Sequence, residues 1–416
     1  MRIAIVGSGV SGLVAAYLLQ RDHEITVFEA DDRVGGHAHT VDVMSGNRRL
    51  GVDTGFMVFN EAAYPNFTKL MHRLGVQSQP SDMSFSVQCA ATGLEYSSTS
   101  FDSLFAQRGN LLRPSFYRML SDIRRFYRES REVLNGNGRF ERVTLGDYLR
   151  ERRYSRAFIE HHIVPMGAAI WSSGPSRFET FPVRQFVRFF DNHSFLQVNN
   201  RIPWRTITGG SRSYVEAITR SFRDRIRVNT AVHGVRRHRE FVELTTDAKL
   251  SDCFDCVVIA VHSDQALRML ADPSDLEQAV LGAIPYQRND TVLHTDRQVL
   301  PMREKAWASW NYHRPRESSN RVSITYCMNK LQNFEAAAPY CVSLNRCPEI
   351  DPSRVVRRMV YHHPVFDHNS FAMQERHREI NGVRRTYYCG AYWGYGFHED
   401  GVRSALAVCE KFGRGL

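Results

Sequence analysis

Three glycines near the amino terminus have the neighbours and the spacing that binding of a dinucleotide requires. Gly7, Gly9 and Gly12 follow a β-branched run at residues 2–6 and precede residues 13–21, which have helical periodicity. Gly7 permits a tight turn, Gly9 lets the backbone approach a pyrophosphate, and Gly12 lets a helix pack closely against a strand. The amino terminus of that helix would direct N–H groups and the positive end of its dipole at the phosphates. The pattern predicts a strand, a turn and a helix that bind a dinucleotide.

An acidic residue closes the second strand that the sequence predicts, at residues 24–28. Glu29 lies 17 positions after Gly12, where a carboxylate can accept hydrogen bonds from both hydroxyls of an adenosine ribose. The same carboxylate would repel a 2′-phosphate. No second GxGxxG motif occurs in the sequence, so a separate NAD(P) site is not expected. These residues leave NAD and FAD as alternatives.

The segments beyond Glu29 resemble FAD proteins of the glutathione-reductase and amine-oxidase type. Residues 31–37, Asp-Asp-Arg-Val-Gly-Gly-His, resemble their Arg-x-Gly-Gly segment, and residues 51–56 resemble the next turn that faces the flavin. Residues 387–401 resemble the last FAD motif of the amine-oxidase superfamily, although Ala391 stands where many relatives carry an acid. In that motif the amino terminus of a helix directs N–H groups at the flavin. The resemblance implies FAD as the cofactor.

The resemblance also implies how the cofactor is held. Relatives use the backbone at the position of Val232 to meet the adenine, and the N–H groups of Gly401 and Val402 are the expected partners of the flavin. Covalent monoamine oxidases attach flavin to a Cys in the segment that corresponds to residues 393–397, which contains none here, so we expect non-covalent FAD. The expected cofactor-binding residues are Gly7, Gly9, Ser11, Gly12, Glu29, Ala30, Arg33, Gly36, His37, Thr54, Gly55, Val232, Gly390, Gly401 and Val402.

The expected fold is α/β, with a Rossmann-type FAD-binding domain of the glutathione-reductase and amine-oxidase type and an inserted α+β substrate domain. The FAD-binding domain is expected at residues 1–80, 205–285 and 376–416, and the substrate domain at residues 81–204 and 286–375. Residues 225–232 and 241–244 have the pattern of two paired strands.

Length and composition place the chain of 416 residues in the globular range. With 43% hydrophobic and 24% charged residues, it differs from disordered, collagenous and coiled-coil proteins. No apolar run approaches the roughly 18 to 20 residues that a membrane-spanning helix needs. The net charge of +10 would attract acidic partners, but the sequence contains no nucleic-acid recognition motif, so we expect no nucleic acid.

Cysteine and histidine pairs do not predict a metal site. The eight Cys residues are scattered, which fits a reducing, cytoplasmic compartment better than a disulfide scaffold. Cys253 and Cys256 have the spacing of a redox or zinc pair, but a second pair is missing and the motif runs directly into an expected strand. The adjacent His residues at 161–162 and 362–363 would point apart on either a strand or a helix. We therefore expect no metal ion.

The first insertion contains a basic amphipathic helix. Phe116, Leu120, Ile123 and Tyr127 fall on one face, and five Arg residues between positions 118 and 131 lie elsewhere. The apolar face can pack on the protein's own core. Alternatively, the helix can rest on an anionic membrane, which would make the protein peripheral to the inner face of that membrane.

Two aromatic stretches, residues 178–196 and 307–312, fit either a core or an apolar tunnel for a long hydrocarbon. A narrower resemblance supports the tunnel. Bacterial amine-oxidase-like flavoproteins encoded beside cyclopropane-fatty-acid synthases are similar to this chain at residues 170–173, 190–193, 204–211, 292–296, 307–312, 363–366 and 395–401. A similar domain is fused to the plant synthases, and one branch of the group desaturates a methyl-branched acyl chain on the way to furan fatty acids.

This resemblance implies an FAD-dependent, desaturase-like oxidoreductase that acts on unsaturated or methyl-branched fatty-acyl chains, free or in phospholipid. It also implies a lipid methyltransferase or cyclopropane synthase as a partner. A flavin-dependent double-bond isomerase, an amine oxidase and a non-catalytic partner of the lipid pathway stay open as alternatives. The amine oxidase is disfavoured, because the lysine that commonly holds water at the flavin of those enzymes has no counterpart in residues 284–291.

Three residues are candidates for roles in catalysis. Tyr395 lies near the aromatic-cage position of amine oxidases and His398 just before the flavin-facing helix, so the resemblance implies that both line the flavin. His294 is a candidate for the base that removes a proton. Each of the three can instead be a hydrogen-bonded structural residue.

Overall fold

A parallel five-stranded sheet carries the glycine motif. In the computed structural model, which describes residues 1–136, 138–197, 202–247, 251–317 and 319–416, its strands lie in the order β19-β13-β1-β2-β9. These strands are β1 (Arg2–Val6), β2 (Glu24–Phe28), β9 (Ile226–Arg227), β13 (Cys256–Ile259) and β19 (Thr386–Tyr388). β1 and β13 are almost continuously buried apolar runs, as expected of parallel strands covered on both faces. The sheet and the helices around it confirm the expected α/β, Rossmann-type fold.

Helices cover one face of this sheet and a small antiparallel sheet covers the other. The helices are α1 (Val10–Leu19), α2 (Pro65–Leu74), α10 (Arg212–Thr219) and α16 (His398–Glu410), and the small sheet contains β10 (Val232–Arg237), β11 (Val242–Thr246) and β12 (Ser251–Phe254). Ile3 and Ile5 pack with the helices, whereas Ala4 and Val6 pack on the side of the small sheet. This division follows from the alternation of side chains along β1.

The expected strand at residues 225–232 is wrong in one respect, because the segment contributes to two different sheets. β9 ends at Arg227 beside β2, whereas Val232 begins β10 and pairs with Thr246 of β11. Asn229 lies between them with a φ of 49°, a left-handed conformation that asparagine tolerates better than most residues. The chain therefore turns where the sequence pattern had suggested one continuous strand.

A seven-stranded mixed sheet forms the floor of the other half of the molecule. Its strands, in spatial order, are β18 (Val355–Pro364), β14 (Tyr286–His294), β17 (Cys341–Leu344), β16 (Ile324–Cys327), β15 (Trp310–Arg314), β6 (Phe85–Cys89) and β7 (Leu94–Ser97). Only β15 and β6 pair in parallel, and the long β14 and β18 pair antiparallel from Tyr286 opposite Pro364 to His294 opposite Val355.

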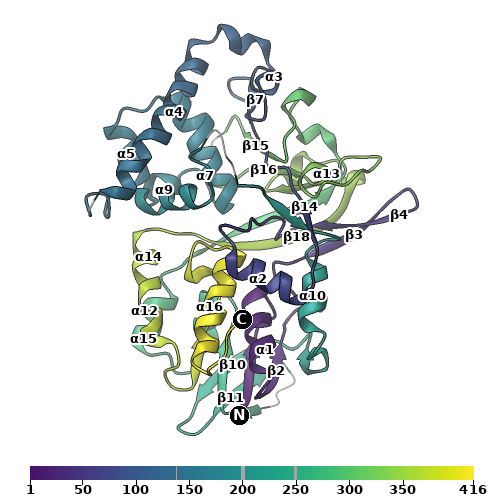
Figure 1. Ribbon diagram of the computed structural model, residues 1–416, viewed down its shortest axis with the longest axis vertical. Coiled ribbons are helices and arrows are strands. Elements are labelled where there is room, and N and C mark those ends of the chain that lie inside the picture. The colour runs from purple at the N-terminus through teal and green to yellow at the C-terminus, as the bar shows by residue number, and fades with distance from the viewer. Residues whose placement is uncertain (137, 198–201, 248–250, 318) are drawn as a thin grey trace.

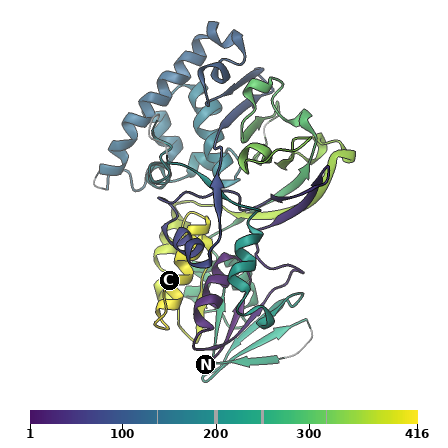
Figure 2. The same ribbon diagram turned by 45° about the vertical axis from the view of Figure 1, so that its right-hand side comes forward.

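A layer of helices packs against this sheet at the end of the molecule far from both termini (Figures 1 and 2). These helices are α3 (Phe101–Leu104), α4 (Pro114–Asn135), α5 (Leu145–Glu151), α6 (Arg156–Phe158), α7 (Val164–Trp171), α8 (Arg177–Thr180) and α9 (Val183–Asn192), with a π-helical turn at Ile159–Ile163. Trp171 contacts Phe186 and Phe189 of α9 with ring centroids 5.8 and 4.6 Å apart. Much of the aromatic stretch at residues 178–196 is therefore core, as one of its two interpretations predicts.

Shorter elements complete the two halves. The strands are β3 (Thr40–Ser45), β4 (Arg48–Asp53), β5 (Ser78–Pro80) and β8 (Arg205–Ile207), and the helices are α11 (Ser263–Met269), α12 (Asp275–Leu281), α13 (Met328–Leu331), α14 (His368–Glu375) and α15 (His377–Ile380). Short 3-10 turns lie at Arg108–Leu112 (η1), Arg223–Arg225 (η3), Arg297–Val299 (η4), Glu304–Ala306 (η5), Cys347–Glu349 (η6), Pro352–Arg354 (η7) and Ala391–Trp393 (η8). Across the described ranges, no helix is both long and apolar enough to cross a bilayer.

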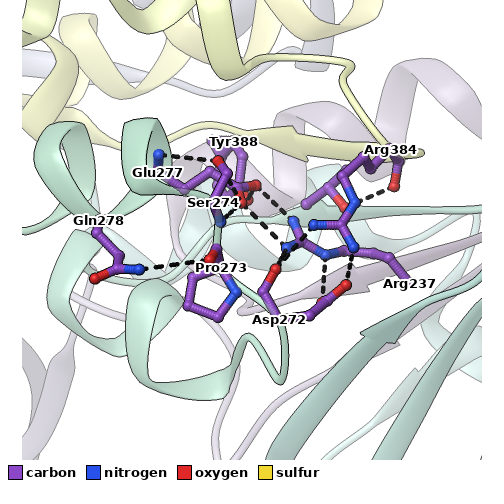
Figure 3. A network of polar contacts seen from close by, with 9 residues as sticks. Arg237, Asp272, Pro273, Ser274, Glu277, Gln278, Arg384 and Tyr388 are labelled. Atoms are coloured by element: carbon purple, nitrogen blue, oxygen red, sulfur yellow. Dashed lines mark hydrogen bonds and ion pairs between the residues drawn. The ribbon is translucent and has the colours of Figure 1, made fainter.

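A buried polar network joins the small sheet to α12 and β19 (Figure 3). The guanidinium of Arg237 donates to Glu277 at 2.5 Å and to Asp272 at 2.8 Å, and the Tyr388 hydroxyl donates to Glu277 at 2.6 Å. Arg384 pairs with Asp272 from the other side. The Arg237 side chain has no exposed surface, so its charge depends on these carboxylates.

Candidate active site

The glycine turn has the shape of a phosphate cradle. A Cβ atom on Gly7, whose φ is +101°, would lie 2.9 Å from the Ala260 carbonyl oxygen, and one on Gly12 would lie 2.0 Å from the Gly7 carbonyl oxygen. A Cβ atom on Gly9 would meet nothing within 4 Å. Packing therefore requires the outer two glycines, whereas Gly9 borders open space at the amino terminus of α1, where an anion is favoured.

Glu29, the acid that is expected to bind the ribose, is held at the carboxyl end of β2. Glu29 accepts hydrogen bonds from the N–H groups of Ser8 and Asp31, each at 3.0 Å, and from the Ser8 hydroxyl. Its neighbour Ala30 follows on the same loop. Arg33 has a buried Nη1 with no partner among the described residues. An unpaired buried guanidinium nitrogen is costly unless an anion meets it, so this position fits an anionic cofactor.

The expected flavin-facing turns lie against the glycine turn and against each other. A Cβ atom on Gly36 would lie 2.9 Å from Gly9 Cα, and one on Gly55 would lie 2.2 Å from the His37 carbonyl oxygen. Thr54 follows β4 in the same turn and donates its hydroxyl to the His39 carbonyl at 3.0 Å. Three segments that the sequence assigned to the cofactor thus meet at one place.

The start of α16 lies beside the start of α1. A Cβ atom on Gly401 would approach Val10 to 2.7 Å and the Ser11 hydroxyl to 3.0 Å. The Gly401 N–H, however, donates to the Phe397 carbonyl at 3.1 Å. The N–H groups that a helix leaves free lie in its first turn. In α16 these belong to residues 398–400, whereas the Gly401 N–H is engaged within the helix and Val402 lies one residue deeper.

The remaining expected cofactor residues lie on either side of this centre. Gly390 lies two residues after the end of β19, and its N–H donates to the Ser404 hydroxyl of α16 at 2.9 Å. Val232 lies two residues beyond Thr230, whose N–H donates to the Glu29 carbonyl at 2.8 Å. The residues present therefore fit an extended dinucleotide that runs from the Glu29 end to the start of α16.

A cavity of about 510 Å³ lies between the two halves and reaches the expected flavin position. Among the sequence-predicted residues, its wall contains His37, Thr54, Gly55, Tyr395 and His398. The rest of the wall comes mainly from aromatic and aliphatic side chains of the helical layer and the mixed sheet. None of the described residues in this wall is Asp, Glu, Lys or Arg.

Tyr395 and His398 are both held by hydrogen bonds at the inner end of the cavity. The Tyr395 hydroxyl donates to Gln185 at 2.8 Å. The His398 ring stacks on Phe56 with centroids 3.5 Å apart, and its Nε2 lies 3.0 Å from the Tyr214 hydroxyl. Burial, helped by the neighbouring His37, holds the pKa of His398 well below its ordinary value, so its imidazole is neutral.

His193 also lines the cavity, although it is not among the residues that the sequence predicts to act in catalysis. Its Nδ1 lies 2.8 Å from the Phe189 carbonyl oxygen. Because a carbonyl only accepts, Nδ1 carries the hydrogen and Nε2 keeps its lone pair. Burial lowers the pKa of His193 to about 4. Position 193 falls in one of the segments that carried the narrower resemblance, but the tautomer depends on the backbone four residues earlier, and only the structure shows that contact.

His363 lines the same cavity, but it has the other tautomer, in which Nδ1 accepts a hydrogen bond. Asn289 accepts from Asn345 at 2.7 Å and donates to the Ser172 carbonyl at 2.9 Å, which fixes the orientation of its amide. Its Nδ2 therefore donates to His363 Nδ1 at 2.8 Å, and His363 Nε2 carries the hydrogen. Burial and the nearby His37 keep the pKa of His363 well below its ordinary value.

The structure does not bring His294 to this site. His294 is fully buried on β14, outside the cavity wall. Its Nε2 lies 2.8 Å from the Ser343 hydroxyl, and its Nδ1 accepts from the Asp296 N–H at 3.1 Å. With both nitrogens engaged inside the sheet, His294 has the structural role that the sequence left open.

The pairs that resemble metal or redox motifs have structural positions. Cys253 is exposed and Cys256 is buried in β13, and both are free thiols. In the part of the chain that the structure describes, no group of three or more His, Cys, Asp or Glu side chains could hold a metal ion.

Comparison with known proteins identifies the family. The model of flavin containing amine oxidoreductases matches residues 10–347. The chain belongs to this amine oxidoreductase family. FAD is therefore its cofactor.

Curated relatives in this amine oxidoreductase family are distant. A protein of Mycobacterium tuberculosis named as a flavin-containing monoamine oxidase, AofH, is 24% identical over 286 residues, which is 65% of this chain and 59% of that protein. Protoporphyrinogen oxidase 2 of Arabidopsis thaliana is 44% identical over 79 residues, which is 19% of this chain and 15% of that protein. The chain thus aligns with less than two thirds of either relative.

Solved structures of similar fold cover the whole chain. A fatty acid isomerase from P. acnes that produces CLA superposes with a TM-score of 0.71 at 15% identity, over 99% of this chain and 98% of that one. Cyclohexylamine oxidase from Brevibacterium oxydans gives a TM-score of 0.69 at 14% identity, over 99% of both chains. At such identities the likeness establishes the fold shared across the amine oxidoreductase family.

Proposed function

We propose that this FAD-dependent oxidoreductase acts on unsaturated or methyl-branched fatty-acyl chains and introduces a double bond. The observation that carries the proposal is the cavity wall, which is apolar and contains no charged side chain among the described residues. A long hydrocarbon gains free energy when such a wall removes it from water. The narrower resemblance to the flavoproteins encoded beside cyclopropane-fatty-acid synthases supports the same substrate class.

The same wall disfavours a polyamine or another cationic substrate. An ammonium group buried here would lose its hydration without gaining a carboxylate partner. The cavity wall offers such a group only neutral side chains, among them the Tyr395 hydroxyl and the ring of His398. Amine oxidation is therefore the less favoured activity for this member of the family.

The chain's own residues supply what a desaturation needs besides the cofactor. FAD, when bound, accepts a hydride together with its electron pair. The neighbouring carbon must then release a proton, and the two electrons of that C–H bond form the new C=C bond. The lone pair on His193 Nε2 faces the same cavity and is the group that we assign to accept this proton. The apolar wall keeps water away from the reacting carbons.

A redox-neutral double-bond isomerase is the second candidate. The fatty acid isomerase from P. acnes shares the fold over nearly the full chain, and an isomerase would use the same apolar cavity. In that case the hydride returns to the acyl chain at another carbon, so no electrons leave the site.

One experiment separates these functions. The holoprotein is mixed anaerobically with phospholipids of defined unsaturated or methyl-branched acyl chains, and the flavin absorbance is followed. Mass spectrometry then locates the double bonds of the product. Stable bleaching with one added double bond supports the desaturase, whereas a shifted double bond with oxidised flavin supports the isomerase. Neither bleaching nor a changed chain would contradict the proposal and favour a non-catalytic partner of a lipid methyltransferase or cyclopropane synthase.

A further inference from the structure

The cavity opens to solvent at one end of the molecule. Three residues of its wall, Ser98, Ser100 and Phe101, are exposed, and Phe101 at the start of α3 is 73% exposed. The opposite end of the cavity meets the flavin-facing residues His37 and His398. A ligand that reaches the flavin position along this cavity therefore enters past Phe101.

Exposed apolar side chains lie at Phe101 and on the elements next to it. We call them the apolar rim: Phe101, Leu111, Leu112, Tyr117 and Met302. Leu112 is 87% exposed and Met302 is 86% exposed, which are the highest values among the exposed large hydrophobic side chains of the described residues. Single exposed apolar residues are ordinary, but a cluster at the entrance of an apolar cavity indicates contact with an apolar partner.

Short contacts hold the rim together. The rings of Phe101 and Phe105 lie 4.8 Å apart, and those of Phe105 and Tyr117 lie 6.2 Å apart. The Tyr117 hydroxyl donates to the Leu111 carbonyl at 3.1 Å. The turn η5, which follows Met302, packs on α3 and β7. The rim is thus one surface built from α3, η1, the first turn of α4 and the approach to η5.

Cations border this rim. Arg108 and Lys305 contact Asp102, the neighbour of Phe101, at 2.5 and 2.9 Å, so two positive charges share one negative charge there. Residues 101–131 contain seven Arg residues and three acidic residues. The elements α3, η1 and most of α4 therefore have a net positive charge.

One stripe of α4 carries arginines without partners. Arg124, Arg128 and Arg131 are exposed, and none of them forms an ion pair with any described residue. They share a face because residues three and four apart on a helix are neighbours. By the same spacing, Tyr117 of the rim lies on this stripe. We call these three residues the arginine stripe.

The paired arginines of α4 lie on a different face. Arg118 and Arg125 contact the buried Asp122 at 3.6 and 3.5 Å, and Arg125 also contacts Glu129 at 3.0 Å. Phe116 is buried in the core, as the first interpretation of this helix predicts. The charge that α4 offers to a partner therefore comes from the arginine stripe.

We propose that the apolar rim and the arginine stripe dock on an anionic lipid bilayer, so that an acyl chain passes from the bilayer past Phe101 into the cavity. This inference rests on the proposed function for its substrate, but docking itself does not require turnover. Apolar side chains ringed by cations suit the boundary between acyl chains and lipid phosphates.

The distribution of charge favours a bilayer lipid over a free fatty acid. A free carboxylate drawn into the cavity would find no cation in the described wall. A phospholipid phosphate can instead stay outside, beside Arg108, Lys305 and the arginine stripe, while its acyl chain fills the wall. The cationic side chains therefore lie outside the cavity, where the head group would remain, and the described cavity wall that would contact the acyl chain contains none.

Vesicle binding tests this inference on the full-length holoprotein. We expect cosedimentation with vesicles of phosphatidylglycerol and phosphatidylcholine in equal parts, weaker binding to pure phosphatidylcholine, and weakening by added salt. The triple variant Arg124→Gln, Arg128→Gln, Arg131→Gln should bind the anionic vesicles on the order of a hundredfold more weakly, at about 1 kcal/mol for each basic residue near the surface. The double variant Leu112→Ser, Met302→Ser should also bind more weakly.

Two control variants remove the same number of arginines or of apolar side chains as the test variants, but from other surfaces. The variant Arg48→Gln, Arg239→Gln, Arg378→Gln removes three exposed arginines from other faces, and Met44→Ser, Val356→Ser removes two exposed apolar side chains. Both controls should bind anionic vesicles like the wild-type protein.

Two results would overturn the docking inference: wild-type protein that does not bind anionic vesicles, or rim and stripe variants that bind like their controls. Turnover of detergent-dispersed phospholipid tests the proposed function separately. Bleaching in detergent without vesicle binding would refute docking alone, whereas vesicle binding without any bleaching would refute the proposed oxidation and leave docking intact. Binding to a protein partner in place of vesicles would also refute the inference.

Discussion

A single backbone carbonyl gives His193 its chemistry. The Phe189 carbonyl holds the hydrogen on Nδ1, at 2.8 Å, and leaves the Nε2 lone pair in a cavity that contains no charged side chain among its described residues. Because burial lowers the pKa to about 4, the ring is neutral at neutral pH and its Nε2 lone pair is not protonated. The residue type alone does not reveal this, since a histidine on an apolar helix face is as consistent with a structural role.

Replacing His193 tests this assignment. We expect His193→Gln to lower the rate of acyl-chain oxidation by about 10²–10⁴-fold, the usual contribution of a positioned general base. FAD content and the flavin spectrum should not change, because His193 is not among the expected cofactor residues. His72→Gln, at an exposed position of α2, is the control. Turnover of His193→Gln at the wild-type rate would show that another group takes the proton.

Gly9 and Gly12 are glycines for different reasons: Gly9 leaves room for the cofactor, and Gly12 leaves room for the chain itself. Alanine substitutions at the two positions distinguish these reasons. Gly9→Ala has room for its Cβ atom in the protein alone and should fold with nearly wild-type stability while it binds FAD at least about tenfold more weakly. Gly12→Ala places a Cβ atom 2.0 Å from the Gly7 carbonyl oxygen and should impair folding itself. Urea denaturation and FAD fluorescence titration measure the two effects. Equal FAD affinity in Gly9→Ala and wild type would place the pyrophosphate elsewhere.

At the scale of elements, short sequence patterns predict the structures that depend only on neighbouring residues. The glycine turn and Glu29 lie where the sequence placed them, because the turn, the helix start and the strand end are all encoded within 29 residues. Residues 225–232 were misassigned because one residue, Asn229 with a φ of 49°, redirects the chain between two sheets. His294 was selected by residue type, but its partners Ser343 and Asp296 become visible only once β14 and β17 pair.

The network around Arg237 predicts a large effect of one substitution. Glu277→Gln removes the charge that pairs with a guanidinium without exposed surface, so we expect the free energy of unfolding to fall by about 3–5 kcal/mol. Glu240→Gln, on a side chain that is 77% exposed, should change it by less than about 0.5 kcal/mol. Urea denaturation at neutral pH measures both variants. Equal stability of the two would mean that the buried pair is dispensable.

At the scale of the whole molecule, the site forms only when distant parts of the chain pack together. The cavity draws its wall from the glycine-motif half, the mixed sheet and the helical layer, which are separated by hundreds of residues in places. Aromatic density fits either a core or a tunnel, and the structure places Phe178 and Phe186 in the core but Phe195 and Trp310 in the cavity wall. That the described wall lacks every charged residue type could not be read from the sequence, because it depends on which side of each helix and strand faces inward.

Buried histidines across the molecule make its stability depend on pH. Burial lowers the pKa to about 4 for His37, His39, His193, His262, His294, His313 and His377. Below about pH 6.5 the histidines of the unfolded chain bind protons, whereas these folded-state imidazoles stay neutral until about pH 4. The free energy of unfolding therefore falls as the pH drops toward 4. The decrease is about 2 kcal/mol per group at about pH 5. Asp53 and Asp400, whose pKa burial raises to about 6, act in the opposite direction but are fewer.

Urea denaturation at a series of pH values checks this expectation. The midpoint should decrease between about pH 7 and pH 5, and His377→Gln should reduce the slope by one proton. A midpoint that is constant or rises toward pH 5 would contradict the account of the buried imidazoles.

The most direct test of the central claim compares two substrates at the same flavin. The holoprotein is mixed anaerobically, in detergent, either with a phospholipid that carries unsaturated acyl chains or with putrescine, and flavin absorbance is recorded through a single turnover. The uncharged wall predicts that the lipid alone reacts, either bleaching the flavin with one new double bond or shifting an existing double bond. Bleaching by putrescine, with an unaltered lipid, would contradict the claim and make the protein an amine oxidase.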